Sequence, residues 1–150
     1  MKEKLTVMLV AAVSLIRSDG RVLMQRRRYD AVHGGLWEFP GGKVEAGETV
    51  ENAAVREVHE ELGIELDADC LRPVSFASEP SGNTSGGRKP VVILLYTCAQ
   101  WRGDPECRDA EELGWFEPGA LADLPMPPLD YPLARALLGA IAGGYAGNPG

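Results

Sequence analysis

The chain has 150 residues, with 22 Asp and Glu against 15 Lys and Arg, so its formal net charge is −7. This length suits one domain, and the 45% hydrophobic fraction is that of a globular protein, not of a disordered or fibrous chain. Because basic surfaces hold phosphate backbones, the acidic balance argues against general affinity for a nucleic acid polymer. The charge is concentrated in residues 38–67, which hold nine acids and two bases, whereas the other residues hold thirteen of each. That segment is the first candidate for a functional site.

The predicted strands cover residues 5–17, 21–27, 71–78, 91–101 and a short segment around 113–116. Residues 18–20, Ser-Asp-Gly, predict a hairpin turn between the first two strands, and a glycine-rich loop follows over residues 34–47. We expect residues 79–90 to form a mobile loop and residues 130–142 to form a helix. Together these elements predict one α+β domain over residues 1–142, followed by a flexible glycine-rich tail over residues 143–150.

The cysteines and the apolar segments indicate the compartment. The chain has three cysteines that form no CxxC pair: Cys70, Cys98 and Cys107. We expect free thiols in a reducing cytosol. The apolar run at residues 7–16 is too short to cross a bilayer, and no small-residue cleavage site follows a basic segment. A cytoplasmic protein without a membrane partner is the prediction.

A helix rich in glutamate lies in the acidic segment. Thr49 is a suitable N-cap, the helix is expected to run to about Leu62, and Gly63 stops it in the C′ position. Its buried stripe is predicted to be Val50, Ala54, Val58 and Leu62. On another face, three carboxylates share one turn: Glu57, Glu60 and Glu61. They form either a solvated acidic face or a site for a hard divalent cation such as Mg²⁺ or Mn²⁺.

The residues before the helix favour the cation site. Gly41 and Gly42 allow a backbone to approach a metal or phosphate closely. Arg56 lies eight residues after Glu48 and four before Glu60, so its guanidinium could bridge the two carboxylates and hold their rotamers.

This segment matches a known pattern. Gly42, five residues, Glu48, seven residues and then residues 56–64, Arg-Glu-Val-His-Glu-Glu-Leu-Gly-Ile, agree with the Nudix box at its nine defining positions over 23 residues. The chain therefore resembles the Nudix hydrolases, and the flanking residues 36–43 resemble their MutT-like branch. The similarity runs from about Val7 to Leu138. It implies an α/β/α sandwich with a central mixed β-sheet and a loop–helix–loop catalytic motif.

The resemblance also implies an activity. Such an enzyme hydrolyses a nucleoside triphosphate to a monophosphate and pyrophosphate by attack of water at the β-phosphorus, with Mg²⁺, or Mn²⁺, as cofactor. The implied metal ligands are the Gly41 carbonyl, Glu57, Glu60 and Glu61, and Arg56 with Glu48 would orient them. The expected substrate is 8-oxo-dGTP or a related purine nucleotide, bound as a small molecule by a monomer or homodimer. The alternatives are a pyrimidine triphosphate such as CTP, ADP-ribose, or a non-catalytic nucleotide-binding domain.

Three consecutive arginines, Arg26, Arg27 and Arg28, end the second predicted strand. They form either a solvated strand end or a nucleotide contact, and at most two of them can face one site because a strand alternates its faces. By resemblance, Arg27 contacts the nucleotide, and Arg26 is the alternative.

The resemblance places base recognition at Asp130, where MutT-like enzymes carry an asparagine after Pro-Pro. Asp130 is equally a candidate N-cap for the last helix. An ionised aspartate only accepts hydrogen bonds, so the preferred base is open, unless burial against the ring protonates Asp130. The implied base pocket also includes Glu38, Phe39 and Pro40.

Two further positions in the sequence concern possible site residues. MutT-like enzymes place a metal-approaching glutamate before a late tryptophan, but here Gly114 precedes Trp115. Glu111 and Glu112 could substitute, with surface residues as the alternative interpretation. His59, at a variable box position, is expected to be an exposed helical residue.

Overall fold

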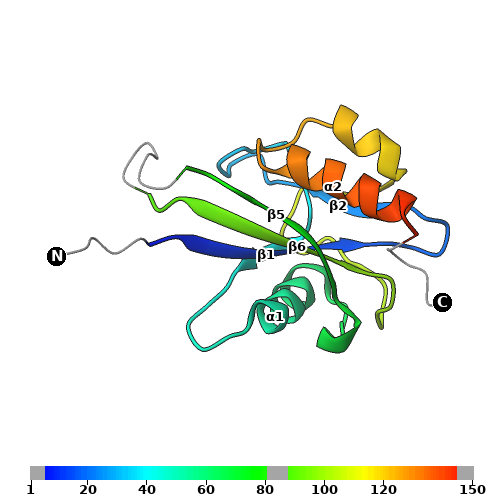
Figure 1. Ribbon diagram of the computed structural model, residues 1–150, viewed down its shortest axis with the longest axis horizontal. Helices are drawn as coiled ribbons and strands as arrows, with labels where there is room; N and C mark the ends of the chain where they lie inside the picture. The colour runs from blue at the N-terminus through cyan, green and yellow to red at the C-terminus, as the bar shows by residue number, and fades with distance from the viewer. Residues whose placement is uncertain (1–5, 81–87, 145–150) are drawn as a thin grey trace.

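The computed structural model describes residues 6–80 and 88–144 (Figure 1). The elements in chain order are β1 (Met8–Leu15), β2 (Val22–Arg26), β3 (Trp37–Glu38), β4 (Gly41–Lys43), α1 (Val50–Leu62), the 3₁₀ helix η1 (Ala68–Cys70), β5 (Arg72–Ser78), β6 (Val91–Cys98), β7 (Glu112–Phe116), the 3₁₀ helix η3 (Pro118–Asp123) and α2 (Asp130–Ala142). Three predictions lie partly outside the described residues: the strand start at residue 5, most of the mobile loop 79–90, and the tail beyond residue 144.

The central sheet is mixed, as expected. Its strand order is β4-β1-β6-β5, with β1 and β6 parallel and the two edge strands antiparallel to their neighbours. The parallel pair is in register from Met8 beside Val91 to Leu15 beside Cys98. Both central strands are rich in apolar residues, because a sheet covered on both faces buries both sides of its strands.

A second sheet, β3-β2-β7, is antiparallel and was not predicted as a separate layer. The predicted hairpin between the first two strands is confirmed at its turn, where Arg17 N–H donates to the Arg21 carbonyl, and at the bridge between Ile16 and Val22. Beyond that bridge the prediction is wrong, because β4 and β6 occupy both edges of β1. Strand β2 therefore leaves β1 and pairs with β3 and β7.

The predicted glycine-rich loop 34–47 is wrong in part, because it contains β3 and β4. Gly41 pairs with Ala12 and Gly42 with Ala11 along β1. A Cβ at Gly41, where φ is +154°, would collide with the Ala11 carbonyl oxygen. Glycine is needed here for close strand pairing, which a composition-based loop prediction does not detect.

The two long helices cover opposite faces of the central sheet (Figure 1). Helix α1 packs on β1 and β4, and α2 packs on β5 and η3. Thr49 caps α1 by accepting from Asn52 N–H, and Gly63 ends the helix with φ of 72°, both as predicted. The buried stripe of α1 is Ala53, Ala54, Val58 and Leu62, so Ala53 replaces the predicted Val50, which is only partly buried.

No helix in residues 6–80 and 88–144 combines the length and apolar composition needed to cross a membrane. The three cysteines are free thiols, with Cys98 buried, Cys70 half-buried and Cys107 exposed.

Candidate active site

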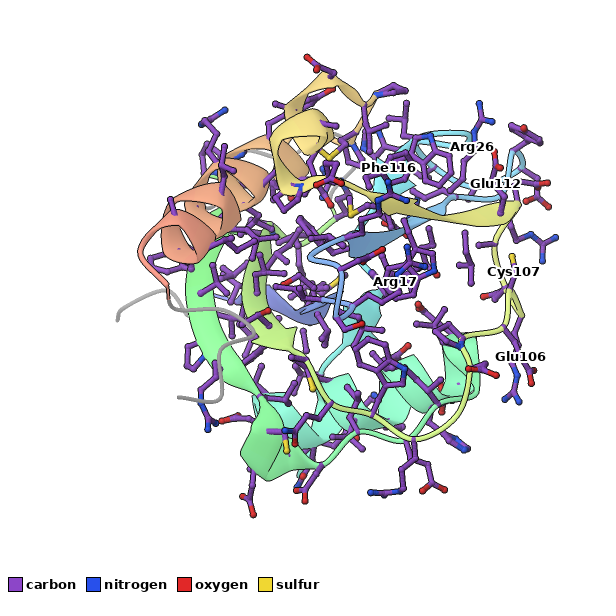
Figure 2. The ribbon with its side chains drawn as sticks, turned by 90° about the vertical axis from the view of Figure 1, so that its right-hand side faces the viewer. Arg17, Arg26, Glu106, Cys107, Glu112 and Phe116 are labelled. Atoms are coloured by element: carbon purple, nitrogen blue, oxygen red, sulfur yellow. The ribbon has the colours of Figure 1, made fainter. Side chains whose placement is uncertain are left out.

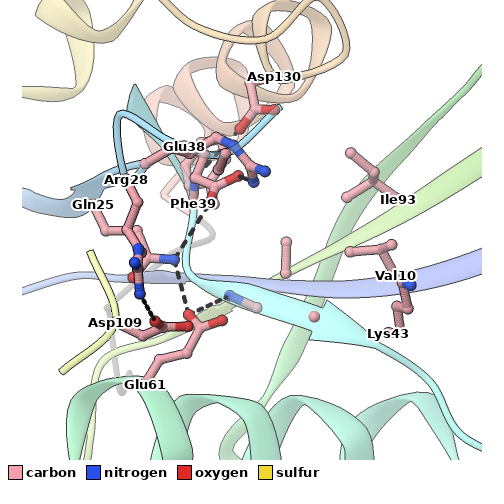
Figure 3. Close-up of a pocket in the computed structure, with 15 residues that line it drawn as sticks. Val10, Gln25, Arg28, Glu38, Phe39, Lys43, Glu61, Ile93, Asp109 and Asp130 are labelled. Atoms are coloured by element: carbon pink, nitrogen blue, oxygen red, sulfur yellow. Dashed lines mark hydrogen bonds and ion pairs between the residues drawn. The ribbon is translucent and has the colours of Figure 1, made fainter. Parts of the chain in front are cut away.

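A pocket of about 320 Å³ opens where the two sheets and both long helices meet (Figure 3). Glu61 of α1 lies at one end, Asp130 of α2 lies at the other, and Glu38 and Phe39 stand between them (Figure 3). The full lining is Val10, Ala12, Gln25, Arg27, Arg28, Ala31, Glu38, Phe39, Gly41, Gly42, Lys43, Glu61, Ile93, Asp109 and Asp130. The pocket therefore joins the carboxylate helix to the residues of the expected base site.

Arg56 organises the helix carboxylates. Its Nε and Nη2 donate to the two oxygens of Glu48, at 2.7 and 2.9 Å. Its Nη1 donates to Glu57 at 2.8 Å and to Glu60 at 3.4 Å. The hydrogen bond from Arg56 lowers the pKa of Glu48 to about 2, so this carboxylate stays ionised. The spacing of Arg56 to Glu48 and Glu60 in the sequence indicates this bridge correctly.

Glu61 is the helix carboxylate that lines the pocket. Its Oε2 accepts from Gln25 Nε2 at 2.8 Å and from Gly41 N–H at 3.3 Å. Burial and, to a smaller extent, the charges of Glu38 and Glu57 together raise the pKa of Glu61 to about 8, against the opposing effect of the two hydrogen bonds. A half-buried carboxylate with two acidic neighbours is one that a bound cation would stabilise in its ionised form.

Gly42 makes room for a second carboxylate. A Cβ at Gly42 would collide with the carboxylate group of Glu57. Edge strand β4 and helix α1 therefore approach so closely that only glycine fits between the strand backbone and this side chain.

The donor chemistry of the site fits a hard divalent cation, because it consists of carboxylate oxygens from one helix turn beside a glycine backbone. Glu57 and Glu60 are directed to Arg56, whereas Glu61 is directed to Gln25 and Gly41. Within the described part of the chain, no three acidic, histidine or cysteine side chains are already gathered around one point. Cation binding therefore requires Glu57 and Glu60 to change partners, and the 57% exposure of the Glu60 side chain leaves it room to do so.

The three consecutive arginines lie at different positions relative to the pocket. Arg27 lines the pocket, where its Nη1 donates to Glu38 at 2.9 Å and its Nε donates to the Val32 carbonyl at 2.7 Å. Arg28 also lines the pocket. Arg26 lies outside the pocket lining and pairs with Glu112 at 3.0 Å, at the start of β7 (Figure 2).

Asp130 does not cap α2, since Leu129 precedes the helix and Asp130 is its first residue. It is 5% exposed, and its Oδ2 accepts from Phe39 N–H at 3.2 Å. Burial and, to a smaller extent, the charge of Glu38 together raise the pKa of Asp130 to about 7, and the Phe39 hydrogen bond opposes the shift. Of the expected base-pocket residues, Glu38 and Phe39 are in the pocket lining. Pro40 is not, and its carbonyl accepts from Val13 N–H.

Glu111 and Glu112 do not line the pocket. Glu111 accepts from Tyr29 N–H, Glu112 pairs with Arg26, and Gly114 lies against Phe116 and Trp37. His59 is exposed, as expected.

Sequence reasoning missed several residues of the lining, namely the polar Gln25, Lys43 and Asp109 and the apolar Val10, Ala12, Ala31 and Ile93. Gln25 is 5% exposed and holds Glu61, and the signal for it was a polar residue at the end of the apolar run Val22–Met24. Lys43 and Asp109 carried no local signal, because only folding brings them to this pocket.

The fold and this site define a Nudix-type hydrolase, with a glutamate-bearing loop–helix–loop set against a mixed sheet. The sequence model of the NUDIX domain matches residues 6–137, and the chain belongs to this family. It is 30% identical over 131 residues to the CTP pyrophosphohydrolase of Escherichia coli K12, covering 87% of this chain and 92% of that protein. It is 34% identical over 129 residues to the 8-oxo-dGTP diphosphatase of Haemophilus influenzae, covering 85% and 89%. The solution structure of the E. coli ORF135 protein superposes with a TM-score of 0.79 at 30% identity, covering 93% of this chain and 94% of that chain.

Proposed function

We propose that this protein is a divalent-cation-dependent nucleoside triphosphate pyrophosphohydrolase that releases a nucleoside monophosphate and pyrophosphate. The observation that carries the proposal is the pocket, which has the half-buried Glu61 at one end and the buried Asp130 at the other. A site of this form can hold the phosphates of a nucleotide at the first end and its base at the second. The relatives named above act on nucleotides of this class.

The residues that would hold the cation are the Gly41 carbonyl, Glu57, Glu60 and Glu61. A bound divalent cation supplies neutralisation of phosphoryl oxygens and a lower pKa for an attacking water. Arg56, fixed by Glu48, orients the carboxylates of Glu57 and Glu60. Gln25 and Gly41 N–H direct Glu61 into the pocket.

At the other end, Asp130 and Phe39 would bind the base, and Arg27 would contact the nucleotide from the opposite wall while Glu38 holds its guanidinium. The Watson–Crick edge of guanine offers two N–H donors, which suits an accepting carboxylate. A purine triphosphate such as 8-oxo-dGTP is therefore the first candidate substrate.

A pyrimidine triphosphate such as CTP is the second candidate, and the pKa of Asp130 favours it specifically. At a pKa of about 7, Asp130 is partly protonated near neutral pH, so it can donate one hydrogen bond and accept another. The N3 acceptor and the adjacent amino donor of cytosine match that form.

The test is a panel that contains 8-oxo-dGTP, the ordinary NTPs and dNTPs, 5-substituted cytidine triphosphates and ADP-ribose, each with Mg²⁺, with Mn²⁺ and with EDTA. We expect at least one triphosphate to yield pyrophosphate and a monophosphate with metal and not with EDTA. No turnover of any triphosphate with either metal would contradict the proposal.

The matched variants are Glu60→Gln, on the proposed metal face, and Glu65→Gln, an exposed residue paired with Arg102. We expect the first to lower kcat by a factor of about 100 or more and the second to leave it unchanged. Equal activity of both variants would show that the metal face is assigned wrongly.

The remaining features of the proposal are cytoplasmic action on free nucleotides, Mg²⁺ as the resident metal, and a monomeric or homodimeric state. The single domain over residues 1–142 with a flexible tail stays a prediction.

A further inference from the structure

Each of the three consecutive arginines donates two hydrogen bonds, and Arg28 has a longer ion pair in addition. Arg26 donates to the Gly35 carbonyl and to Glu112, and its guanidinium lies over the rings of Tyr29 and Trp37. Arg27 donates to the Val32 carbonyl and to Glu38. Both side chains therefore have short, well-directed bonds to their own surroundings.

Arg28 is held differently. Its Nε and Nη2 make a bidentate pair with Asp30, at 3.1 and 3.0 Å, which orients the guanidinium from one side. Its Nη1 lies 3.6 Å from Asp109 Oδ1, a separation longer than a well-formed hydrogen bond. Figure 3 shows this arginine extending along the pocket wall to Asp109, at the end of the pocket that holds Glu61.

The loop that carries Arg28 is closely packed. A Cβ at Gly34 would lie 2.5 Å from the Tyr29 carbonyl oxygen and 2.7 Å from that of Arg28, so the two sides of the loop touch through this glycine. Ala31 N–H donates to the Arg28 carbonyl, and Gly35 N–H donates to that of Arg27. The backbone therefore fixes where Arg28 stands, although its side chain is 54% exposed.

Asp109 belongs to a segment, residues 106–112, that connects α1 to this loop. Glu106 N–H donates to the Leu62 carbonyl at the end of α1, and Arg108 Nη1 donates to the His59 carbonyl. On the other side, Glu111 accepts from Tyr29 N–H. Asp109 is thus supported on both flanks, and its carboxylate faces Arg28 in the pocket (Figure 3).

We propose that Arg28 binds the polyphosphate of the substrate and that Asp109 occupies this arginine until a phosphate oxygen replaces it. The inference rests on the proposed function for the chemistry of the ligand. Asp30 keeps the guanidinium in position during the exchange, while Nη1 passes from the long Asp109 pair to a phosphoryl oxygen. Asp109 then competes with the substrate, so removing its charge should tighten binding.

The charges of the pocket support this assignment. Of its three basic residues, Arg27 is paired with Glu38 at 2.9 Å and Lys43 is an exposed residue on edge strand β4. Arg28 is the one that pairs with Asp109, at the end of the pocket that Glu61 lines, where the phosphates would otherwise meet negative charge. An arginine fork is suited to this task because it can keep a carboxylate on one edge and bind a phosphate with another nitrogen.

The experiment measures inorganic tripolyphosphate binding by calorimetry with Mg²⁺, and KM and kcat for the best nucleotide of the panel. The variants are Arg28→Gln, Arg28→Lys, Asp109→Asn and the double variant Arg28→Gln/Asp109→Asn. Arg21→Gln is the matched control, since Arg21 pairs with exposed Glu117 and does not line the pocket. Thermal unfolding checks that each variant is folded.

We expect Arg28→Gln to raise the Kd of tripolyphosphate and the KM of the nucleotide about tenfold, with kcat within a factor of about two. Arg28→Lys should lie between it and the wild type, and Arg21→Gln should match the wild type. Asp109→Asn should lower both constants about threefold, and only when Arg28 is present.

Unchanged binding in Arg28→Gln would overturn the inference, and so would weaker binding in Asp109→Asn, because Asp109 would then be a support and not a competitor. The binding arm needs no turnover. If no nucleotide is hydrolysed but Arg28→Gln still weakens tripolyphosphate binding, the proposed function fails and this inference stands.

Discussion

Asp130 shows what one buried acid contributes to this fold and to its site. It is 5% exposed and accepts a hydrogen bond from Phe39 N–H, and burial beside Glu38 raises its pKa to about 7. The folded protein therefore holds the Asp130 proton more tightly than the unfolded chain does. The contribution of Asp130 to the free energy of unfolding is therefore fully present below about pH 4, the pKa of an aspartate in the unfolded chain. It is lost as the pH rises through the folded-state pKa of about 7.

We expect Asp130→Asn to be more stable than the wild type at pH 8 by on the order of 3 kcal/mol, because asparagine keeps the acceptor without the buried charge. The difference should shrink as the pH falls below about 7 and be smallest near pH 4. Urea unfolding with EDTA at several pH values measures it. Asp123→Asn, at an exposed acid of η3, is the control and should show no such dependence. A constant stability difference across the range would mean that Asp130 does not titrate there.

At the scale of elements, the site depends on how closely β4 approaches its two neighbours. Gly41 faces the backbone of β1, where a Cβ would collide with Ala11, and Gly42 faces the carboxylate end of Glu57 on α1. A backbone carbonyl inside a sheet cannot move away, whereas the end of a glutamate side chain can. Two adjacent glycines therefore serve different purposes, one in strand pairing and one in presenting the carboxylate.

We expect Gly41→Ala to lower the free energy of unfolding by about 3 kcal/mol or more, because β4 must separate from β1. Gly42→Ala should cost about 1 kcal/mol but remove most of the activity and the metal affinity, because Glu57 is displaced. Denaturant unfolding, kcat and metal titration measure the three effects. Gly119→Ala, where a Cβ meets nothing within 4 Å, should resemble the wild type. Equal damage to stability by Gly41→Ala and Gly42→Ala would contradict this division.

At the scale of the whole molecule, the acidic residues behind the net charge of −7 are concentrated around the candidate site once the chain folds. The acidic segment supplies Glu38 and Glu61 to the pocket and places Glu48, Glu57 and Glu60 around Arg56. The layered arrangement sets the distance between the end of the pocket that holds Glu61 and the end that holds Asp130, because α1 lies on one face of the central sheet and α2 on the other (Figure 1). A divalent cation that binds only the folded site should therefore stabilise the whole domain.

We expect saturating Mg²⁺ to raise the melting temperature by roughly 5–10 °C, since binding at a hundred times Kd contributes about 2.7 kcal/mol. NaCl of equal ionic strength should not reproduce the shift, because screening acts on all exposed charges alike. Glu57→Gln should abolish most of the shift, while Glu51→Gln, in the first turn of the same helix, should keep it. Differential scanning fluorimetry measures these values, and a shift that Glu57→Gln leaves intact would place the cation elsewhere.

Prediction from the sequence succeeded where a local pattern decides the structure. Thr49 and Gly63 bound α1 through cap interactions made within a few residues, and Arg56 bridges Glu48 and Glu60 because they lie on adjacent turns and a nearby loop. It failed where a strand needs a distant partner. The separation of β2 from β1 depends on β4 and β6 occupying both edges of β1, and β6 begins 69 residues after β2.

The order of residues by itself determined the family, the helix with its three glutamates and the arginine that pairs with them, because short-range spacing places those groups together on any such helix. Only the tertiary structure decided which groups share the pocket. It buried Asp130 against Phe39, although a helix cap was an equal expectation. It also placed Arg28 beside Asp109 in the pocket and paired Arg26 with Glu112 outside it. These contacts join residues 81 to 91 positions apart, so long-range packing determines them.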